Sequence, residues 1–179
     1  MKKKDGYVII YVVFVILFLC IIAVGTCTSA LNNLKIQYAS VKQMQDRYTA
    51  EGDIEQFMAE VCVAGEGIDS GGDLYSTPYD AKSAARARFP IMIEDTLNGR
   101  DISIAGGSWV NDSEYKVTLE SSEGSSKVTS EVVFRVTIAT PADTVTIEGE
   151  DQTYYAYKIT DVTSKYISYT LESTGGEPQ

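Results

Sequence analysis

The sequence predicts an α+β protein in which a long N-terminal helix packs on an antiparallel β-sheet. Three observations support this prediction. Residues 6–31 form an uninterrupted apolar run, an apolar repeat of three and four residues follows it, and an apolar–polar alternation begins after Asp101. The first two patterns are typical of helices, and the third is typical of strands with one buried face. A single sheet needs a second layer, which the outer half of the helix would supply.

The apolar run carries no charged side chain between Asp5 and Lys35. A helix of about 20 apolar residues crosses the roughly 30 Å hydrocarbon core of a bilayer. Lysines occupy positions 2–4, and basic residues beside a span favour the cytoplasmic side. We therefore expect residues 1–6 to be a cytoplasmic leader, residues 7–31 to be a transmembrane helix in contact with lipid, and the remainder to lie outside the cytoplasm.

Two kinds of processing compete with a permanent span. The segment Ala23-Val24-Gly25 matches the small-x-small site of a secretory signal peptide, although the apolar run is long for one. A lipoprotein site would need a small residue before the modified cysteine, but Leu precedes Cys20 and Thr precedes Cys27. Either event would leave a secreted domain or a lipoprotein without the helix. The length of the run favours a retained anchor over both.

Residues 32–62 continue the helix as an amphipathic segment. No proline interrupts the chain between Tyr7 and Val61, so one helix there would be roughly 80 Å long. A helical stalk or a coiled coil would show the same stripe. The apolar positions are Leu31, Leu34, Tyr38, Val41, Met44, Tyr48, Ile54, Phe57 or Met58, and Val61.

Residues 63–100 are predicted to form a glycine-rich loop and a short helix. The first part is rich in glycine and aspartate, which favours a flexible loop leaving the long helix. Residues 81–88 are rich in alanine and have high helix propensity. Asp80 can cap this helix at its N-terminus, and Pro90 is expected to end or kink it.

Residues 101–173 are predicted to form an antiparallel β domain, and residues 174–179 a flexible tail. Turn-rich segments at 121–126 and 148–152 separate the strands, and the short connections favour a meander. The alternating apolar residues are Tyr115, Val117 and Leu119; Val132, Phe134, Val136 and Ile138; Val145 and Ile147; Tyr155, Tyr157 and Ile159; and Ile167, Tyr169 and Leu171.

Composition excludes several classes of function. The net charge is −10, and all of it comes from residues 61–179, so we expect no direct nucleic-acid binding, which needs clustered positive charge. The chain has no histidine, which excludes Ser-His-Asp and Cys-His catalysis and histidine-ligated metals. No spacing singles out a pair of carboxylates. We therefore predict no catalytic residue, no metal, no cofactor and no enzymatic activity.

The N-terminal third resembles a known family. It combines Gly6-Tyr7 after a short basic leader, the apolar helix, Leu31-Asn32-Asn33-Leu34-Lys35, and Tyr48-Thr49-Ala50-Glu51-Gly52-Asp53-Ile54-Glu55. Together these resemble the N-terminal region of PilX-type minor pilins of the type IV pilus system. In that group a Gly-Tyr or similar junction opens the helix, and an Ala-Glu followed shortly by Ile-Glu lies further along it. The resemblance covers residues 1 to about 61, and its motif positions here are Ala50, Glu51, Ile54 and Glu55.

The resemblance implies a pilin-like fold and a processing site. Gly6 would be the last residue of a leader removed by prepilin peptidase at the cytoplasmic face. Tyr7 would become the N-methylated first residue of the mature protein. The helix would then leave the bilayer and enter a filament core, in contact with other pilin-like subunits and the pilus assembly machinery. The alternative is that Gly6 is an ordinary glycine at a helix start.

The sequence departs from the pilin pattern at Tyr11. Major pilins resemble one another in carrying a glutamate at this fifth mature position. A carboxylate in hydrocarbon costs about 2.5 kcal/mol or more, so it is kept only where it has a partner. The missing carboxylate favours a minor or initiating subunit over a main filament component. It equally fits a protein that is never cleaved or assembled.

The expected function is therefore that of a minor pilin-like or pseudopilin-like structural subunit of a type IV pilus or a related secretion or uptake filament. The alternative is an unassembled single-pass binding module whose sheet recognises an extracytoplasmic ligand. Both place the protein in the cell membrane, and the first also places it in a surface filament. The filament system, its use in adhesion, secretion, motility or DNA uptake, the neighbouring subunits and any ligand of the β domain are left open by the sequence.

Overall fold

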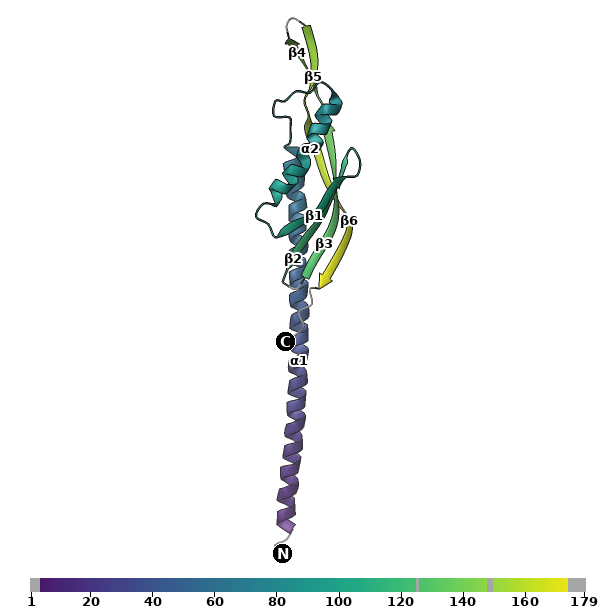
Figure 1. Cartoon of the computed structure of the whole chain (residues 1–179). Coiled ribbons are helices and arrows are strands. Elements are labelled where there is room, and N and C mark those ends of the chain that lie inside the picture. The colour runs from purple at the N-terminus through teal and green to yellow at the C-terminus, as the bar shows by residue number, and fades with distance from the viewer. Residues whose placement is uncertain (1–3, 125, 148–149, 174–179) are drawn as a thin grey trace. The chain divides into compact units, whose positions relative to one another are not determined.

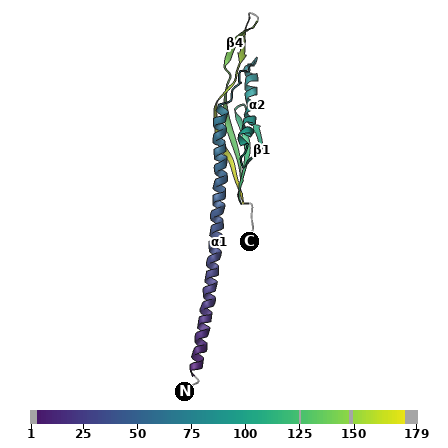
Figure 2. The same cartoon turned by 90° about the vertical axis from the view of Figure 1, so that its left-hand side faces the viewer.

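The computed structural model describes residues 4–124, 126–147 and 150–173 and divides the chain into two compact units, residues 1–44 and 45–179. Figures 1 and 2 show its elements from two directions. The predicted α+β class is confirmed, because a long apolar N-terminal helix is followed by antiparallel sheet. The helix, α1, runs from Lys4 to Glu66.

In the first unit the described chain is helix α1 alone. Both threonines of the apolar run bond to the helix backbone: the Thr26 hydroxyl donates to the carbonyl oxygens of Ile22 and Ala23, and the Thr28 hydroxyl donates to that of Val24. A hydroxyl in hydrocarbon without a partner is costly, so these bonds suit the helix to an apolar environment.

In the second unit, α1 contributes a buried stripe to the core. Its members recur at three- and four-residue steps and are Ala50, Ile54, Phe57, Met58 and Val61. Tyr48, which the sequence pattern placed in the same stripe, is 68% exposed. It lies six residues before Ile54, and at about 100° per residue this turns its side chain well away from the buried face.

The predicted start of the loop at residue 63 is wrong, because α1 continues to Glu66. Gly65 explains the continuation. A Cβ atom at this position would lie 2.8 Å from Val162 and 3.1 Å from Phe89, so the glycine allows the last turn to approach β6 and α2 closely. Glycine is a weak helix former, and here tertiary contact overrides that propensity.

Helix α2 runs from Pro78 to Leu97 and is far longer than the predicted segment 81–88. Its N-cap is Thr77, so the prediction that Asp80 caps it is wrong. The Thr77 hydroxyl accepts a hydrogen bond from the Asp80 backbone N–H (3.1 Å) and donates one to the Asp80 carboxylate (2.7 Å). With Pro78 at the first helical position, the start of α2 is fixed by reciprocal capping.

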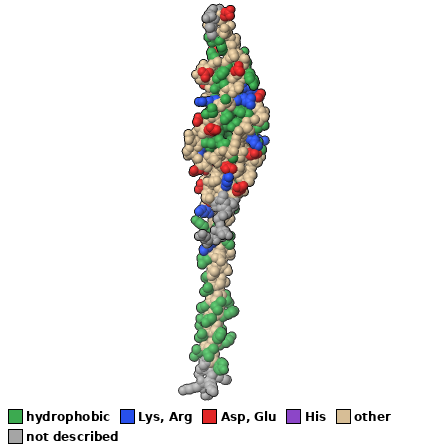
Figure 3. All heavy atoms as spheres, viewed as in Figure 1, with side chains coloured by type: hydrophobic (Ala, Val, Ile, Leu, Met, Phe, Trp, Pro, Cys, Tyr) green, Lys and Arg blue, Asp and Glu red, His purple; other side chains and the backbone are tan. Residues whose placement is uncertain are grey.

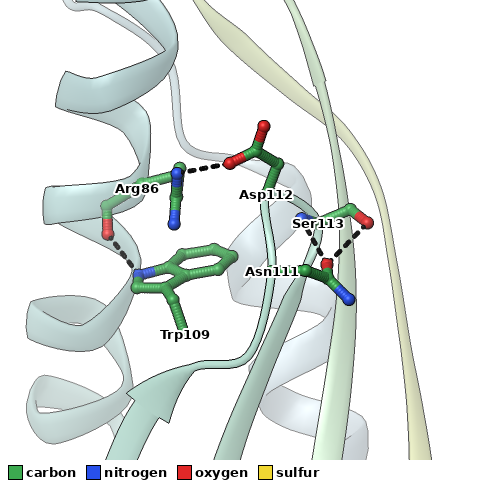
Figure 4. Close-up of polar contacts among 5 residues, drawn as sticks. All are labelled: Arg86, Trp109, Asn111, Asp112 and Ser113. Carbon is green, nitrogen blue, oxygen red and sulfur yellow. Dashed lines mark hydrogen bonds and ion pairs between the residues drawn. The ribbon is translucent and has the colours of Figure 1, made fainter.

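Pro90 lies inside α2, so of the two predicted outcomes, an end or a kink, the end is wrong. Proline has no N–H, so the carbonyl oxygen of Arg86, four residues earlier, lacks its helical donor. The indole N–H of Trp109 donates a 3.1 Å hydrogen bond to that carbonyl (Figure 4). A side chain from the sheet therefore replaces the bond that proline removes.

Four strands form the main sheet in the order β1-β2-β3-β6, with every neighbouring pair antiparallel. Strands β4 and β5 pair with each other in a separate two-stranded sheet, so the meander is interrupted by a hairpin inserted between β3 and β6. The strands are β1 (Ile102–Trp109), β2 (Glu114–Glu123), β3 (Ser126–Ala139), β4 (Ala142–Ile147), β5 (Glu150–Tyr155) and β6 (Lys158–Ser173).

Several predicted strand limits are wrong. The turn predicted at 121–126 is mostly strand, and β5 begins inside the turn predicted at 148–152. The predicted strand across residues 155–159 is interrupted, because Tyr155 exchanges 2.8 Å backbone hydrogen bonds with Tyr75 before β6 starts. The alternation itself is observed, since Tyr157 and Ile159 are buried and Lys158 is exposed. Residues 167–171 belong to β6, where a bulge at Ile167 shifts the register.

The core of the second unit lies between the helices and one face of the main sheet. Its side chains come from α1, from α2 through Phe89 and Ile93, and from alternating positions of the strands. The buried strand residues are Ile102 on β1; Tyr115, Val117 and Leu119 on β2; Val128, Val132, Phe134 and Val136 on β3; and Ile159 and Val162 on β6. The predicted packing of the outer part of the long helix on the sheet is therefore observed.

Candidate functional site

The first candidate surface is the apolar part of α1, residues 7–31. Among the residues that the structure describes, α1 is the one helix long and apolar enough to cross a membrane. Large apolar side chains in this segment are 41–81% exposed. Covering a valine, leucine, isoleucine or phenylalanine side chain is worth about 1.5–3 kcal/mol. This surface therefore requires lipid or protein around it.

The sequence-predicted processing positions lie inside this helix. Gly6 and Tyr7 follow the first helical residue, Lys4, without a break, and Tyr7 is 81% exposed. Tyr11, at the position of the missing glutamate, is 72% exposed on the same helix. Gly6 and Tyr7 are adjacent in the chain, and hydrophobic side chains follow them along the helix (Figure 3).

The four motif positions Ala50, Glu51, Ile54 and Glu55 separate into two faces of α1. Ala50 and Ile54 are fully buried in the core, four residues apart, so both face the sheet. Glu51 is half-buried, and Glu55 is exposed. Ala50 and Ile54 therefore pack the helix against the sheet, while the two carboxylates lie beside this buried face.

Glu51 connects α1 with the far end of the chain. Its carboxylate accepts a hydrogen bond from the hydroxyl of Tyr169 on β6 and pairs with Arg47, one turn earlier, at 2.7 Å. The Arg47 guanidinium lies 5.6 Å from the centre of the Tyr169 ring, within range of a cation–π contact. The bond from Tyr169 lowers the pKa of Glu51, and Arg47 adds to that effect.

Tyr166 lies three residues before Tyr169 on β6 and faces the same side of α1. Burial raises the pKa of its hydroxyl to about 12, and the charges of Glu55 and Glu51 act in the same direction. The hydroxyl therefore stays protonated at physiological pH. The resemblance pointed to Glu51 and Glu55, but their tyrosine partners, more than 100 residues away, carried no signal in the sequence.

A second cluster, also missed in the sequence, lies between α2 and the β1–β2 connection (Figure 4). Arg86 pairs with Asp112 at 2.8 Å, and its guanidinium lies 4.9 Å from the centre of the Trp109 ring. Asn111 accepts hydrogen bonds from the backbone N–H and hydroxyl of Ser113. Because these contacts satisfy groups within the fold, the cluster fastens α2 to the sheet.

Within residues 4–124, 126–147 and 150–173, no three Cys, Asp or Glu side chains gather closely enough to hold a metal ion. The ionisable groups with shifted pKa values are explained by ion pairs, hydrogen bonds and burial within the fold. The arrangement is suited to holding elements together and presenting surfaces.

Comparison of the chain with protein-family models, with curated proteins and with solved structures found no match.

Proposed function

We propose that the protein is a minor pilin-like structural subunit of a type IV pilus or a related secretion or uptake filament. The observation that carries the proposal is the continuous helix α1, which exposes an apolar surface over residues 7–31 and inserts Ala50 and Ile54 into the core of an α+β unit. Such a helix can exchange lipid for neighbouring apolar helices, since both cover the same side chains. The sheet unit then provides lateral contacts or the exposed surface.

The proposed orientation and processing follow from the N-terminal sequence. The lysines at positions 2–4 favour a cytoplasmic N-terminus, with residues 45–179 outside the cytoplasm. Prepilin peptidase would cleave after Gly6 and leave an N-methylated Tyr7. Tyr11 in place of a glutamate favours a minor or initiating subunit, because the docking charge of a main filament subunit is missing.

Mass spectrometry of the mature N-terminus tests this proposal. The protein is examined in membranes and in sheared surface material, from cells with and without prepilin peptidase. We expect a chain that begins at N-methylated Tyr7, only when the peptidase is present. A chain that keeps Lys2 to Gly6 in every fraction contradicts the proposal, and recovery as the bulk constituent of a purified fibre contradicts its minor status.

The second candidate is an unassembled, membrane-anchored binding module. Tyr11 favours it as well, since a helix without the glutamate has no charge to dock on a neighbour. The same experiment separates the candidates, because the anchored module would retain its leader and would be absent from sheared material.

A further inference from the structure

The face of the main sheet turned away from the helices carries a groove of about 540 Å³. It crosses β2, β3 and β6, whose outward-facing residues alternate with the buried core positions. The side chains that matter for its chemistry are Glu114, Val133, Arg135, Thr163, Lys165 and Ile167.

Two cations flank this groove. Arg135 pairs directly with Thr163 in the β3–β6 register, and Val133 pairs with Lys165, so the two basic residues are diagonal neighbours. Such diagonals are about 7–8 Å apart, which leaves room for one anionic group between them. The uncharged side chains of Val133 and Thr163 form the floor.

The two cations differ in how they are neutralised. Arg135 bonds to Glu114 at 2.9 Å through one of its terminal nitrogens, which leaves its other donors for a ligand. Lys165 forms no ion pair with any residue that the structure describes. By contrast, Lys116 and Lys127 on the same face are each paired with a glutamate, at 2.8 and 2.9 Å. The groove therefore holds a cation that lacks a counter-charge in a chain of net charge −10.

One end of the groove is apolar. Ile167 is the extra residue of the β6 bulge, between the pairs Val132–Tyr166 and Glu131–Ser168, and its side chain is 56% exposed. If a carboxylate side chain of a protein segment bound between the two cations, the neighbouring residues of that segment would lie next to Ile167. The groove thus fits an acidic protein segment with apolar neighbours better than a free inorganic anion.

The β4–β5 hairpin, here called the arm, has the matching chemistry. It carries Asp143, Glu150 and Asp151 in its strands, and no lysine or arginine occurs between Arg135 and Lys158. Apolar Val145 lies among these acidic residues. The arm extends beyond the four-stranded sheet in the unit 45–179 (Figure 1) and is not paired with it. The base of the arm is held by the backbone hydrogen bonds between Tyr155 and Tyr75, and its strands otherwise pair only with each other. A two-stranded hairpin is marginally stable in water, so a partner would stabilise the outer part of the arm.

We propose that the cationic groove of one copy receives the acidic arm of a second copy. This rests on the proposed function, in which the sheet units make lateral contacts, and it names the surfaces that make them. The contact is heterologous, since groove and arm are different surfaces, and it can therefore repeat from copy to copy as a filament requires. Between acidic chains the contact is electrostatic, so it weakens as salt rises.

Sedimentation of the full chain in detergent micelles, at low and high ionic strength, tests this inference. We expect self-association that weakens with salt, unlike contacts between apolar helices. Lys165→Glu in the groove or Glu150→Lys in the arm should each weaken self-association about tenfold or more, as loss of a close charge pair does. The double variant restores the opposite charges and should recover most of the loss. Lys82→Glu on α2, with the same charge change outside the groove, is the matched control.

Several results would overturn the groove–arm contact: a monomer at every salt concentration, single variants that associate as well as wild type, or a folded double variant without recovery. Far-UV circular dichroism checks folding, and Lys165→Gln replaces Lys165→Glu if the latter does not fold. Because sedimentation does not depend on cleavage after Gly6, the contact can hold while the pilin proposal fails, or the reverse. Lys82→Glu changes the net charge by the same amount as Lys165→Glu but lies outside the groove. We therefore expect Lys82→Glu to associate as wild type does.

Discussion

Glu51 is held by two side chains that come from opposite ends of the sequence of the unit 45–179, Arg47 on its own helix and Tyr169 on the last strand. A hydrogen bond to a charged group is stronger than one between neutral groups, and partial exposure reduces its contribution. At the scale of residues, this carboxylate therefore ties the position of β6 to that of α1.

Tyr169→Phe removes this hydrogen bond while keeping the ring over Arg47. We expect the free energy of unfolding to fall by about 1 kcal/mol at neutral pH, a value near the low end for a charged acceptor because Glu51 is partly solvated. Chemical denaturation of wild type and variant measures the difference. Tyr154→Phe is the control, since its hydroxyl bonds only to Gln152, on its own strand. Equal losses in both variants would contradict the role given to Tyr169.

The same contact predicts a pH dependence. The pKa of Glu51 is lowered in the folded protein, so its contribution to stability is complete above the unfolded pKa and is lost as the pH falls through the folded one. The difference between wild type and Tyr169→Phe should therefore shrink below about pH 4. Denaturation curves at several pH values measure it, and a difference that is constant down to pH 2 would exclude the ionised carboxylate as acceptor.

For the contact between Glu51 and Tyr169, the sequence pointed to the helix residue and not to its partner on the strand. Ile54 could be identified as a buried residue of the helix because the spacing of the apolar stripe is local, whereas Ala50 was identified only as a motif position of the family resemblance. Tyr169, 118 residues from Glu51, could not be identified, because no local pattern records which strand position faces a given helix turn. Thr77 was overlooked as a cap because Asp80, three residues later, has the same capping propensity.

At the scale of elements, α2 remains helical beyond Pro90 with help from the sheet. The Arg86 carbonyl has lost its helical donor and accepts the Trp109 indole N–H instead. The sequence predicts a break at this point because a proline is a local signal and its compensation is not. The prediction of a helix ending near residue 88 failed for this reason.

The energies of Pro90 and Trp109 should therefore be coupled. Trp109→Phe in the wild-type background leaves the Arg86 carbonyl without a donor, whereas in a Pro90→Ala background the new backbone N–H supplies one. We expect the cost of Trp109→Phe to be about 1 kcal/mol smaller in the second background. A double-mutant cycle by denaturant unfolding measures this coupling. Identical costs would show that the indole bond does not replace the helical one.

Two of the glycines in helix α1, Gly52 and Gly65, have different surroundings. Gly65 is enclosed by Val162 and Phe89, and Gly52 has open space where a Cβ atom would lie. Gly65→Ala should destabilise the protein by about 1–2 kcal/mol, because overpacking exceeds the gain in helix propensity. Gly52→Ala should stabilise it by up to about 1 kcal/mol. Thermal unfolding of both variants checks the opposite signs, and a stabilising Gly65→Ala would contradict the close approach.

On the scale of the molecule, the two units differ in where their apolar side chains lie. Every residue of the main core cluster lies at or beyond Ala50, while the exposed apolar run lies before residue 44. The sequence predicted this division well, since a membrane-length apolar run and a period-two region are both long, local patterns. It did not predict the insertion of β4 and β5, because alternation says which residues face inward but not which strands pair.

This division predicts that residues 45–179 fold without the rest of the chain. Expressed alone, this fragment should be soluble without detergent and should unfold cooperatively, since it keeps the whole core. Circular dichroism and denaturant unfolding test this. A variant of the fragment with Phe134→Ala, which empties a fully buried position, should lose about 3–5 kcal/mol and serves as the control for a real core. A fragment that aggregates or unfolds gradually would show that the apolar helix is needed for folding.

The pairing of β3 with β6 has a consequence for export. Ser126 pairs with Ser173, 47 positions later (173 minus 126). The β4–β5 hairpin between β3 and β6 does not pair with β3, so it does not take the place of β6. In the orientation proposed above, a chain that crosses the membrane from its anchored N-terminal end delivers β6 last. Until then β3 is paired with β2 alone and its other edge is open, the hydroxyl of Tyr169 is absent from Glu51, and Val162 does not cover Gly65. In that orientation the unit 45–179 is completed only after translocation is nearly finished, and a chain stalled or truncated before Lys158 would expose the open edge of β3 to proteases outside the cytoplasm.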